Sequence, residues 1–287
     1  MNRRMRVRHL VMATCLSLLT SSVAWSAAPQ LRFERGDSGY GVSVALNGRP
    51  ILTSPAEGLW SIATDWKDGW PTDWVHAGPT QRQSVGEWTI LTGKLSTKSG
   101  TWLLRDAYRL EGDLVQCVRR FTWQGEDTAK RTTLSVRFQC PGKGAAVLLP
   151  GILYHGNPSG ARSGRVPIYE GQPGESAFFE EHRFPMPYAS IEWPDSSGRT
   201  GVALHSLPSP APFGHRPDQW WSLGLTARDN GTELALLSGP CASNGRKSVV
   251  KATQNGFLPY DHAYLDVPAG AIIEKTFYLQ VYDVDSE

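Results

Sequence analysis

The sequence predicts an all-β protein, built as a large sandwich of two antiparallel sheets. Short apolar runs recur along the whole chain, and the 29 glycines and 20 prolines lie mostly between them. No stretch shows convincing helical periodicity. Many short strands separated by frequent turn signals are typical of a sandwich or a barrel.

The chain begins with the features of a secretory signal peptide. A basic stretch that contains Arg3 and Arg4 precedes the apolar residues 10–19, and small residues follow as far as Ala28. This order of basic, apolar and small-residue regions predicts cleavage, and cleavage after Ser26 fits best. The pattern predicts a secreted or periplasmic protein. No composition shift or linker divides residues 27–287, so they are expected to form one β-sandwich domain.

Removal of residues 1–26 changes the charge of the chain. The leader carries four of the 29 basic residues and none of the 27 acidic ones, which leaves 25 against 27, or −2. A nearly neutral surface gives no reason to expect nucleic acid or an anionic membrane as a partner. No other segment is apolar over the 18 or more residues that a membrane span needs.

The expected strands and turns follow from apolar runs and from the residues that end them. Asn47-Gly48 lies between two apolar arms and is a strong hairpin signal, because both residues tolerate positive φ. Glu111-Gly112-Asp113 and Asp229-Asn230-Gly231 are further tight turns. The remaining strands are expected at 42–52, 88–95, 101–110, 114–123, 132–140, 145–153, 189–193, 201–205, 221–227, 232–237, 248–253 and 272–284.

Three cysteines remain in the mature chain: Cys117, Cys140 and Cys241. Strands 114–123 and 132–140 can be paired as a hairpin in which Phe121 faces Val136 and Cys117 faces Cys140. This register allows a Cys117–Cys140 disulfide in an oxidising compartment. Two buried free thiols that pack as small hydrophobes are the alternative.

Three tryptophans, Trp66, Trp70 and Trp74, fall in a stretch rich in Gly, Pro and Asp, which reads as a loop. Flat aromatic rings beside carboxylates and amides suit sugars, because the C–H faces stack while polar groups bind the hydroxyls. The pattern predicts a sugar-binding platform. The alternative is that these rings cover a sheet edge or a neighbouring domain.

A second candidate segment runs from Ala145 to Gly160. Its apolar half reads as a buried strand over 145–153, and its second half carries Tyr154, His155 and Asn157 among breakers. Polar groups on a loop at the end of a rigid strand are typical of binding sites. A plain turn with an exposed Tyr and His is the alternative.

A third candidate is the charged segment that ends in Glu180-Glu181-His182-Arg183. In a strand, only Glu180 with His182, or Glu181 with Arg183, would share a face and could perform acid–base chemistry or bind hydroxyls. A solvated run of charges is the alternative. No spacing predicts a metal site, and no motif predicts a cofactor.

The segment Leu149–Pro158, together with Glu181-His182-Arg183-Phe184-Pro185-Met186-Pro187, resembles the N-terminal β-sandwich region of secreted bacterial six-hairpin glycosidase-like proteins. The resemblance covers roughly residues 31–283 and implies a galactose-mutarotase-like super-sandwich in a carbohydrate context. In that architecture an (α/α) toroid follows and normally supplies the catalytic carboxylates. This chain ends at Glu287, so a helical catalytic domain on another chain is an expected partner. The resemblance also implies that the Tyr154–Asn157 loop faces a sugar or the partner domain.

Three classes of function stay open. The first is an exported accessory domain that binds an oligo- or polysaccharide, and its binding residues are expected to be Trp66, Trp70, Trp74, Tyr154, His155, Asn157 and Arg183. The second is a small epimerase, lyase or glycosidase that uses a His/Glu pair on a concave sheet face, with candidates His155, His182, Glu180, Glu181 and Glu192. The third is a structural or assembly role, in which the aromatic residues are buried against another protein.

Overall fold

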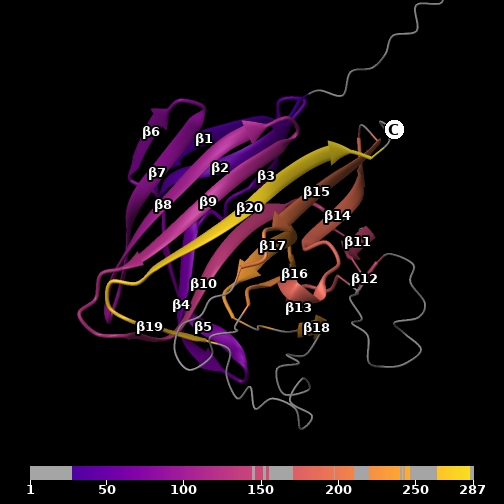
Figure 1. Ribbon diagram of the computed structural model, residues 1–287. Helices are drawn as coiled ribbons and strands as arrows, with labels where there is room; N and C mark the ends of the chain where they lie inside the picture. The colour runs from indigo at the N-terminus through magenta and orange to yellow at the C-terminus, as the bar shows by residue number, and fades with distance from the viewer. Residues whose placement is uncertain are drawn as a thin grey trace, which may run out of the picture.

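The computed structural model describes residues 28–143, 146–150, 153–154, 171–196, 198–209, 220–239, 241, 243–245 and 264–284. It contains two large sheets, in which every strand pairing is antiparallel (Figure 1). Within the described ranges the sole helical element is one 3₁₀ turn, η1 (Glu181–Arg183). The predicted class, an all-β sandwich of two antiparallel sheets, is confirmed.

The first sheet has eleven strands, and the path β1-β2-β3-β10-β17-β16-β13-β18 forms its main body. Strand β4 joins β10 and carries β5, and β19 also pairs with β10. Its strands are β1 (Gln30–Gly36), β2 (Gly39–Leu46), β3 (Arg49–Thr53), β4 (Trp60–Lys67), β5 (Trp70–Ala77), β10 (Ala129–Cys140), β13 (Ser176–Glu180), β16 (Ser222–Arg228), β17 (Gly231–Leu237), β18 (Ser243–Gly245) and β19 (Leu265–Val267).

The second sheet has nine strands in the order β12-β11-β14-β15-β20-β9-β8-β7-β6. In Figure 1 the long strand β20 runs between β9 and β15 at the centre of this sheet. Its strands are β6 (Gln81–Val85), β7 (Trp88–Thr97), β8 (Gly100–Glu111), β9 (Leu114–Trp123), β11 (Ala146–Leu149), β12 (Leu153–Tyr154), β14 (Tyr188–Asp195), β15 (Gly198–Ser206) and β20 (Ile272–Asp283).

Three hairpins were predicted correctly from their turn signals. Asn47 and Gly48 both adopt positive φ, 52° and 78°, between β2 and β3. Glu111-Gly112-Asp113 joins β8 to β9, and Asp229-Asn230 joins β16 to β17. Of the predicted strand over 145–153, residues 146–149 form β11 and Leu153 begins β12, while residues 145, 151 and 152 lie outside the described residues. The predicted strand over 248–253 lies outside them as well.

The expected hairpin between residues 114–123 and 132–140 is wrong. Strand β9 pairs with β8 and β20 in the nine-stranded sheet, whereas β10 lies in the other sheet. Phe121 and Val136 are both in the main core cluster, so their apolar faces pack across the sandwich rather than along one sheet. A strand shows the same apolar face whether its neighbour pairs with it in one sheet or packs against it from the other sheet. The apolar pattern alone therefore could not distinguish a hairpin from packing across the core.

The Cys117–Cys140 disulfide is accordingly not formed. Cys117, Cys140 and Cys241 are free and buried. Burial raises the pKa of the Cys140 thiol to about 12, and burial also raises the pKa values of Cys117 and Cys241. The alternative, thiols that pack as small hydrophobes, is the one that the structure shows.

The ion pair of Asp106 and Arg119 lies inside the sandwich between the two sheets. Asp106 on β8 and Arg119 on β9 are direct cross-strand neighbours, and both side chains are 0% exposed. Arg119 binds the carboxylate through Nε and Nη2, at 2.9 and 2.7 Å. Its Nη1 donates across the core to the carbonyl oxygen of Ser135 on β10, at 3.0 Å. Arg119 therefore links the two sheets.

We predict that Arg119→Met lowers the free energy of unfolding by about 3–5 kcal/mol, because it leaves the Asp106 carboxylate buried without its partner. The matched control is Arg120→Met on the same strand. Arg120 pairs with Glu274 at 2.9 Å, but these side chains are 45% and 48% exposed, so the loss should stay below about 1 kcal/mol. Urea unfolding of both variants measures the difference, and equal losses would contradict the assignment.

We also predict that the cysteines from residue 27 onward titrate as three thiols once the protein is unfolded without reductant, and that the folded protein reacts slowly, because all three are buried. Ellman's reagent with and without denaturant provides the measurement. A count of one thiol in the unfolded, unreduced protein would show that a disulfide exists.

Candidate functional site

Two adjoining hollows lie on the outer face of the eleven-stranded sheet, the side turned away from the sandwich core, and together we call them the outer groove. Residues of β10 alternate between the two sides: Val136 and Phe138 face the core, and Arg137 and Gln139 face outward. Strand β17 alternates likewise, with Leu234 inward and Glu233 outward. The hairpin of β4 and β5 brings further side chains to the same face.

The first hollow is aromatic on one side and has a volume of about 350 Å³. Trp70 and Trp74 of β5 and Phe178 of β13 contribute its rings. Trp70 and Phe178 meet edge to face, with ring centroids 5.7 Å apart. The rest of the lining comes from the neighbouring strands and loops: Glu57, Pro71, His76, Arg137, Gly174, Ser176, Thr226, Arg228, Glu233, Ala235 and Leu237.

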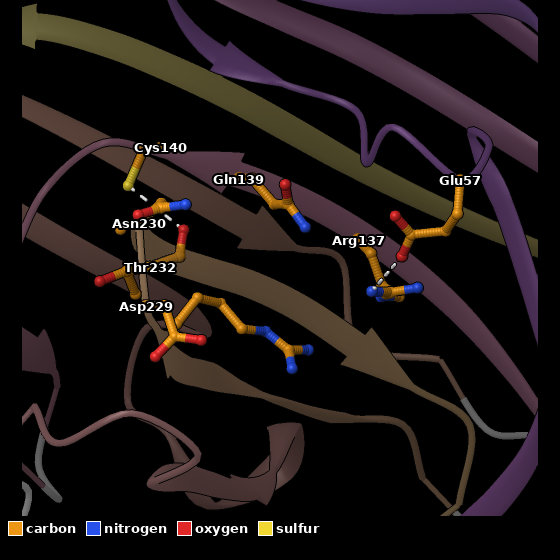
Figure 2. Close-up of a pocket in the computed structure, with 9 residues that line it drawn as sticks. Glu57, Arg137, Gln139, Cys140, Asp229, Asn230 and Thr232 are labelled. Atoms are coloured by element: carbon orange, nitrogen blue, oxygen red, sulfur yellow. Dashed lines mark hydrogen bonds and ion pairs between the residues drawn. The ribbon is translucent and has the colours of Figure 1, made fainter. Parts of the chain in front are cut away.

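The second hollow is polar and has a volume of about 330 Å³. Figure 2 shows Glu57 and Arg137 at one end of it, and Asp229, Asn230 and Thr232 at the other end near Cys140. Gln139 lies between these ends (Figure 2). The two hollows share three lining residues, Glu57, Arg137 and Arg228.

Arg137 is the centre of the polar network in the outer groove. It binds Glu233 through two hydrogen bonds, from Nε to Oε1 at 3.0 Å and from Nη2 to Oε2 at 2.8 Å. Nη2 also donates to Glu57 Oε1 at 2.8 Å, and Nη1 donates to Ser61 Oγ at 2.9 Å. The guanidinium carbon lies 5.9 Å from the centre of the Trp74 ring. The aromatic and polar parts of the groove thus meet at one side chain.

Glu233 is held as a carboxylate. It also accepts hydrogen bonds from Arg228 at 2.8 Å and from Gln139 at 3.2 Å. Burial alone would raise the pKa of Glu233, but the hydrogen bonds and charges of Arg137 and Arg228 outweigh burial and lower it. A carboxylate with these partners is suited to fix Arg137 in place, not to accept and release a proton near neutral pH.

His76 borders the same groove. Its Nδ1 lies 2.8 Å from the hydroxyl of Ser61, which also accepts from Arg137. Burial lowers the pKa of His76, and the charge of Arg137 lowers it further. The ring is therefore neutral at neutral pH and can offer hydrogen bonds to a polar, uncharged ligand.

The three predicted tryptophans have different positions. The stretch that read as a loop is the β4–β5 hairpin, with its turn at Asp68-Gly69, where both residues adopt positive φ. Trp66 is 6% exposed, and its Nε1 donates to Thr133 Oγ1 at 2.8 Å. Trp66 is thus buried and does not line either hollow of the outer groove. Trp70 and Trp74 line the outer groove, and their sugar-binding role remains a prediction.

The charged segment does not continue as a strand beyond Glu180, so the strand geometry behind the expected pairings does not apply. Strand β13 ends at Glu180, and η1 follows. As a result Glu180 binds Arg183, three residues later, at 2.5 Å. The Nε2 atom of His182 lies 3.8 Å from the same carboxylate. Glu180, His182 and Arg183 do not line either hollow of the outer groove.

Glu181, one of the catalytic candidates, is buried in an ion pair inside the fold. Its side chain is 0% exposed and binds Lys275 of β20 at 2.6 Å, between the two sheets. It also accepts from Ser206 Oγ at 2.5 Å and from the backbone N–H of Ser209 at 2.9 Å. Burial lowers the pKa of Lys275 to about 8, although Glu181 opposes that shift.

Glu192 lies on the nine-stranded sheet and does not line either hollow of the outer groove. It belongs to β14 and contacts Arg199 at 3.0 Å and the hydroxyl of Tyr282 at 3.2 Å. Tyr154 is at the end of β12, and its side chain is not described. His155 and Asn157 lie outside the described residues.

The residues that organise the groove, Arg137, Glu233 and His76, were not predicted from the sequence. Arg137 shares β10 with Lys130 and Arg131, and Glu233 is the one charged residue of β17. Charged residues of this kind are usually assigned to a solvated face. Both residues alternate with apolar neighbours along their strands, but ordinary solvated charges on a half-buried strand do the same. Among the described residues, no group of three or more His, Cys, Asp or Glu side chains is arranged to hold a metal. No helix in the described residues has the length and hydropathy of a membrane span.

Comparison with known proteins gives remote structural likenesses. No protein-family model matches the sequence, and no curated protein matches it. A galactose mutarotase-like protein from Lactobacillus casei is 10% identical, with a TM-score of 0.46, over 88% of this chain and 100% of that one. Another from Clostridium acetobutylicum is 8% identical, with a TM-score of 0.47, over 90% and 99%. A Synechocystis protein is 13% identical, with a TM-score of 0.47, over 89% and 96%. No activity or substrate is carried over from these likenesses.

Proposed function

We propose that this protein binds carbohydrate in the outer groove. The observation that carries the proposal is that Trp70 and Trp74 line the same hollow as the Arg137–Glu233 pair. A sugar ring has an apolar C–H face and a rim of hydroxyls. It therefore needs an aromatic surface and fixed hydrogen-bonding groups within one small site.

The electrostatics of the groove favour binding over catalysis. Glu233 accepts hydrogen bonds from Arg137 and Arg228, and Arg137 also donates a hydrogen bond to Glu57. Groups held in this way present a fixed surface, which lowers the ordering cost when a ligand binds. General acid–base catalysis instead requires a group that gains and loses a proton near the working pH.

The wider role that we propose is an exported accessory domain of a glycoside-hydrolase-like protein. The basic and apolar leader over residues 1–26 supports export. The motifs at Leu149–Pro158 and Glu181–Pro187 support the carbohydrate context through their resemblance to six-hairpin glycosidase-like proteins. A helical catalytic domain on another chain is the partner that this role implies.

We predict that Trp70→Ala and Trp74→Ala each weaken sugar binding by roughly tenfold or more, because each removes an aromatic contact from the centre of the site. Trp88→Ala is the matched control, because Trp88 lies on β7 of the nine-stranded sheet and does not line the outer groove. Its ring centre lies 4.8 Å from the guanidinium carbon of Arg109. A glycan array identifies the ligand, and calorimetry measures the affinities. Thermal unfolding shows whether each variant is folded.

Unchanged affinity in folded Trp70→Ala and Trp74→Ala proteins would refute the aromatic site. The variants Trp70→Phe and Trp74→Phe keep a ring in place. They should therefore retain more affinity than the alanine variants if stacking is the cause.

Catalysis is the second candidate function, and one contact favours it. Glu180 and His182 approach to 3.8 Å, which is an acid–imidazole pair of the kind that sugar chemistry uses. If the protein only binds, incubation with its glycan ligands will release no reducing ends and will form no epimer or unsaturated product. Turnover that Glu180→Gln and His182→Ala abolish would establish the enzyme instead.

A further inference from the structure

We infer that the two hollows of the outer groove form one continuous site whose ligand is a neutral oligosaccharide of at least two sugar units. This inference rests on the proposed carbohydrate function and goes beyond it in ligand length and charge. Its basis is the way in which the hollows are joined, and the charges that line them.

The hollows adjoin along a line of ion pairs. Glu57, Arg137 and Arg228 border both of them, so a ligand that fills one meets the same side chains as a ligand that fills the other. Each hollow, at about 350 and 330 Å³, is at the small end of the range for small-molecule sites. One hollow therefore suits a single ring, and a linked chain is needed to occupy both.

The linings of the two hollows differ in the way that successive units of one chain would require. The first hollow offers the rings of Trp70 and Trp74, which suit the apolar face of a sugar. The second offers the amides of Gln139 and Asn230 and the carboxylate of Asp229, which suit hydroxyl groups. Aromatic contact would dominate at one unit, and hydrogen bonding at the next.

The charges of the groove favour a neutral ligand. Two guanidinium groups, Arg137 and Arg228, line it, and both are bonded to the carboxylate of Glu233. Two further carboxylates, Glu57 and Asp229, line the polar hollow. A uronate or a sulfated sugar would bring another negative charge into a groove whose cations are already paired. Like charges brought together at a binding surface cost affinity and exclude wrong partners.

The test is a calorimetric titration with neutral gluco-, galacto-, manno- and xylo-oligosaccharides of one to six units, and with oligogalacturonate as the acidic series. In the class that binds, the step from one unit to two should raise the affinity at least tenfold. The second unit adds contacts after the first has already met the cost of association. Oligogalacturonate should bind at least tenfold more weakly than the neutral chain of equal length.

Two variants separate the hollows. Asn230→Ala alters only the polar hollow, and it should reduce the affinity for the longer chain to near that for one unit, with the affinity for one unit unchanged. Glu87→Ala, at an exposed position between β6 and β7, is the matched control. Trp74→Ala, which alters the aromatic hollow, should weaken binding of every length.

Equal affinity for one unit and for longer chains would overturn the inference, as would tighter binding of oligogalacturonate. Equal loss at every length in Asn230→Ala would overturn it as well. In each of these outcomes sugar binding that depends on Trp74 would still support the proposed function. Failure of every sugar to bind would refute both.

Discussion

Four charged side chains lie inside the sandwich, and they form two ion pairs side by side. Arg119 and Lys275 are cross-strand partners on β9 and β20, and their carboxylates are Asp106 and Glu181. Both pairs connect the nine-stranded sheet to the eleven-stranded one. Arg119 donates to the carbonyl oxygen of Ser135 on β10, and Lys275 binds Glu181, which directly follows β13. A buried charge is tolerated only with such partners. The pairs therefore constrain how the two sheets can be placed on one another.

This constraint extends from the core to the outer groove. Arg119 fixes the carbonyl of Ser135, and the hydroxyl of Ser135 donates to the carbonyl of Ser61 at 2.6 Å. The hydroxyl of Ser61 then contacts both His76 and Arg137. A short series of hydrogen bonds thus joins the centre of the sandwich to the polar centre of the groove. Preorganised polar groups of this kind are what selective binding sites depend on.

The sequence predicted the fold class and most central strands, because alternation and turn residues act locally. Asn47-Gly48 and Asp229-Asn230-Gly231 mark their hairpins without help from tertiary contacts. Asp68-Gly69 is the same kind of signal, but the surrounding tryptophans and proline concealed it as a loop. Whether β9 pairs with β10 in one sheet or packs against it across the core depends on contacts between distant segments. The sequence pattern therefore did not predict it.

The site was predicted only in part for a related reason. Trp70 and Trp74 were identified by their residue type, and they do line the groove. Arg137 and Glu233 come from strands β10 and β17, and only the pairing of those strands brings the two side chains together. Lys275 and Glu181 are 94 positions apart and meet only in the assembled sandwich. Nothing in the local pattern distinguishes these charges from solvated ones.

The most direct test of the account is a crystal structure of the protein with a neutral oligosaccharide bound. We expect that one sugar ring lies against Trp70 and Trp74 and that the next unit lies beyond Arg137, toward Asn230, with the Arg137–Glu233 pair intact. A ligand bound elsewhere on the molecule, or a groove in which Arg137 has left Glu233 to bind it, would contradict the account.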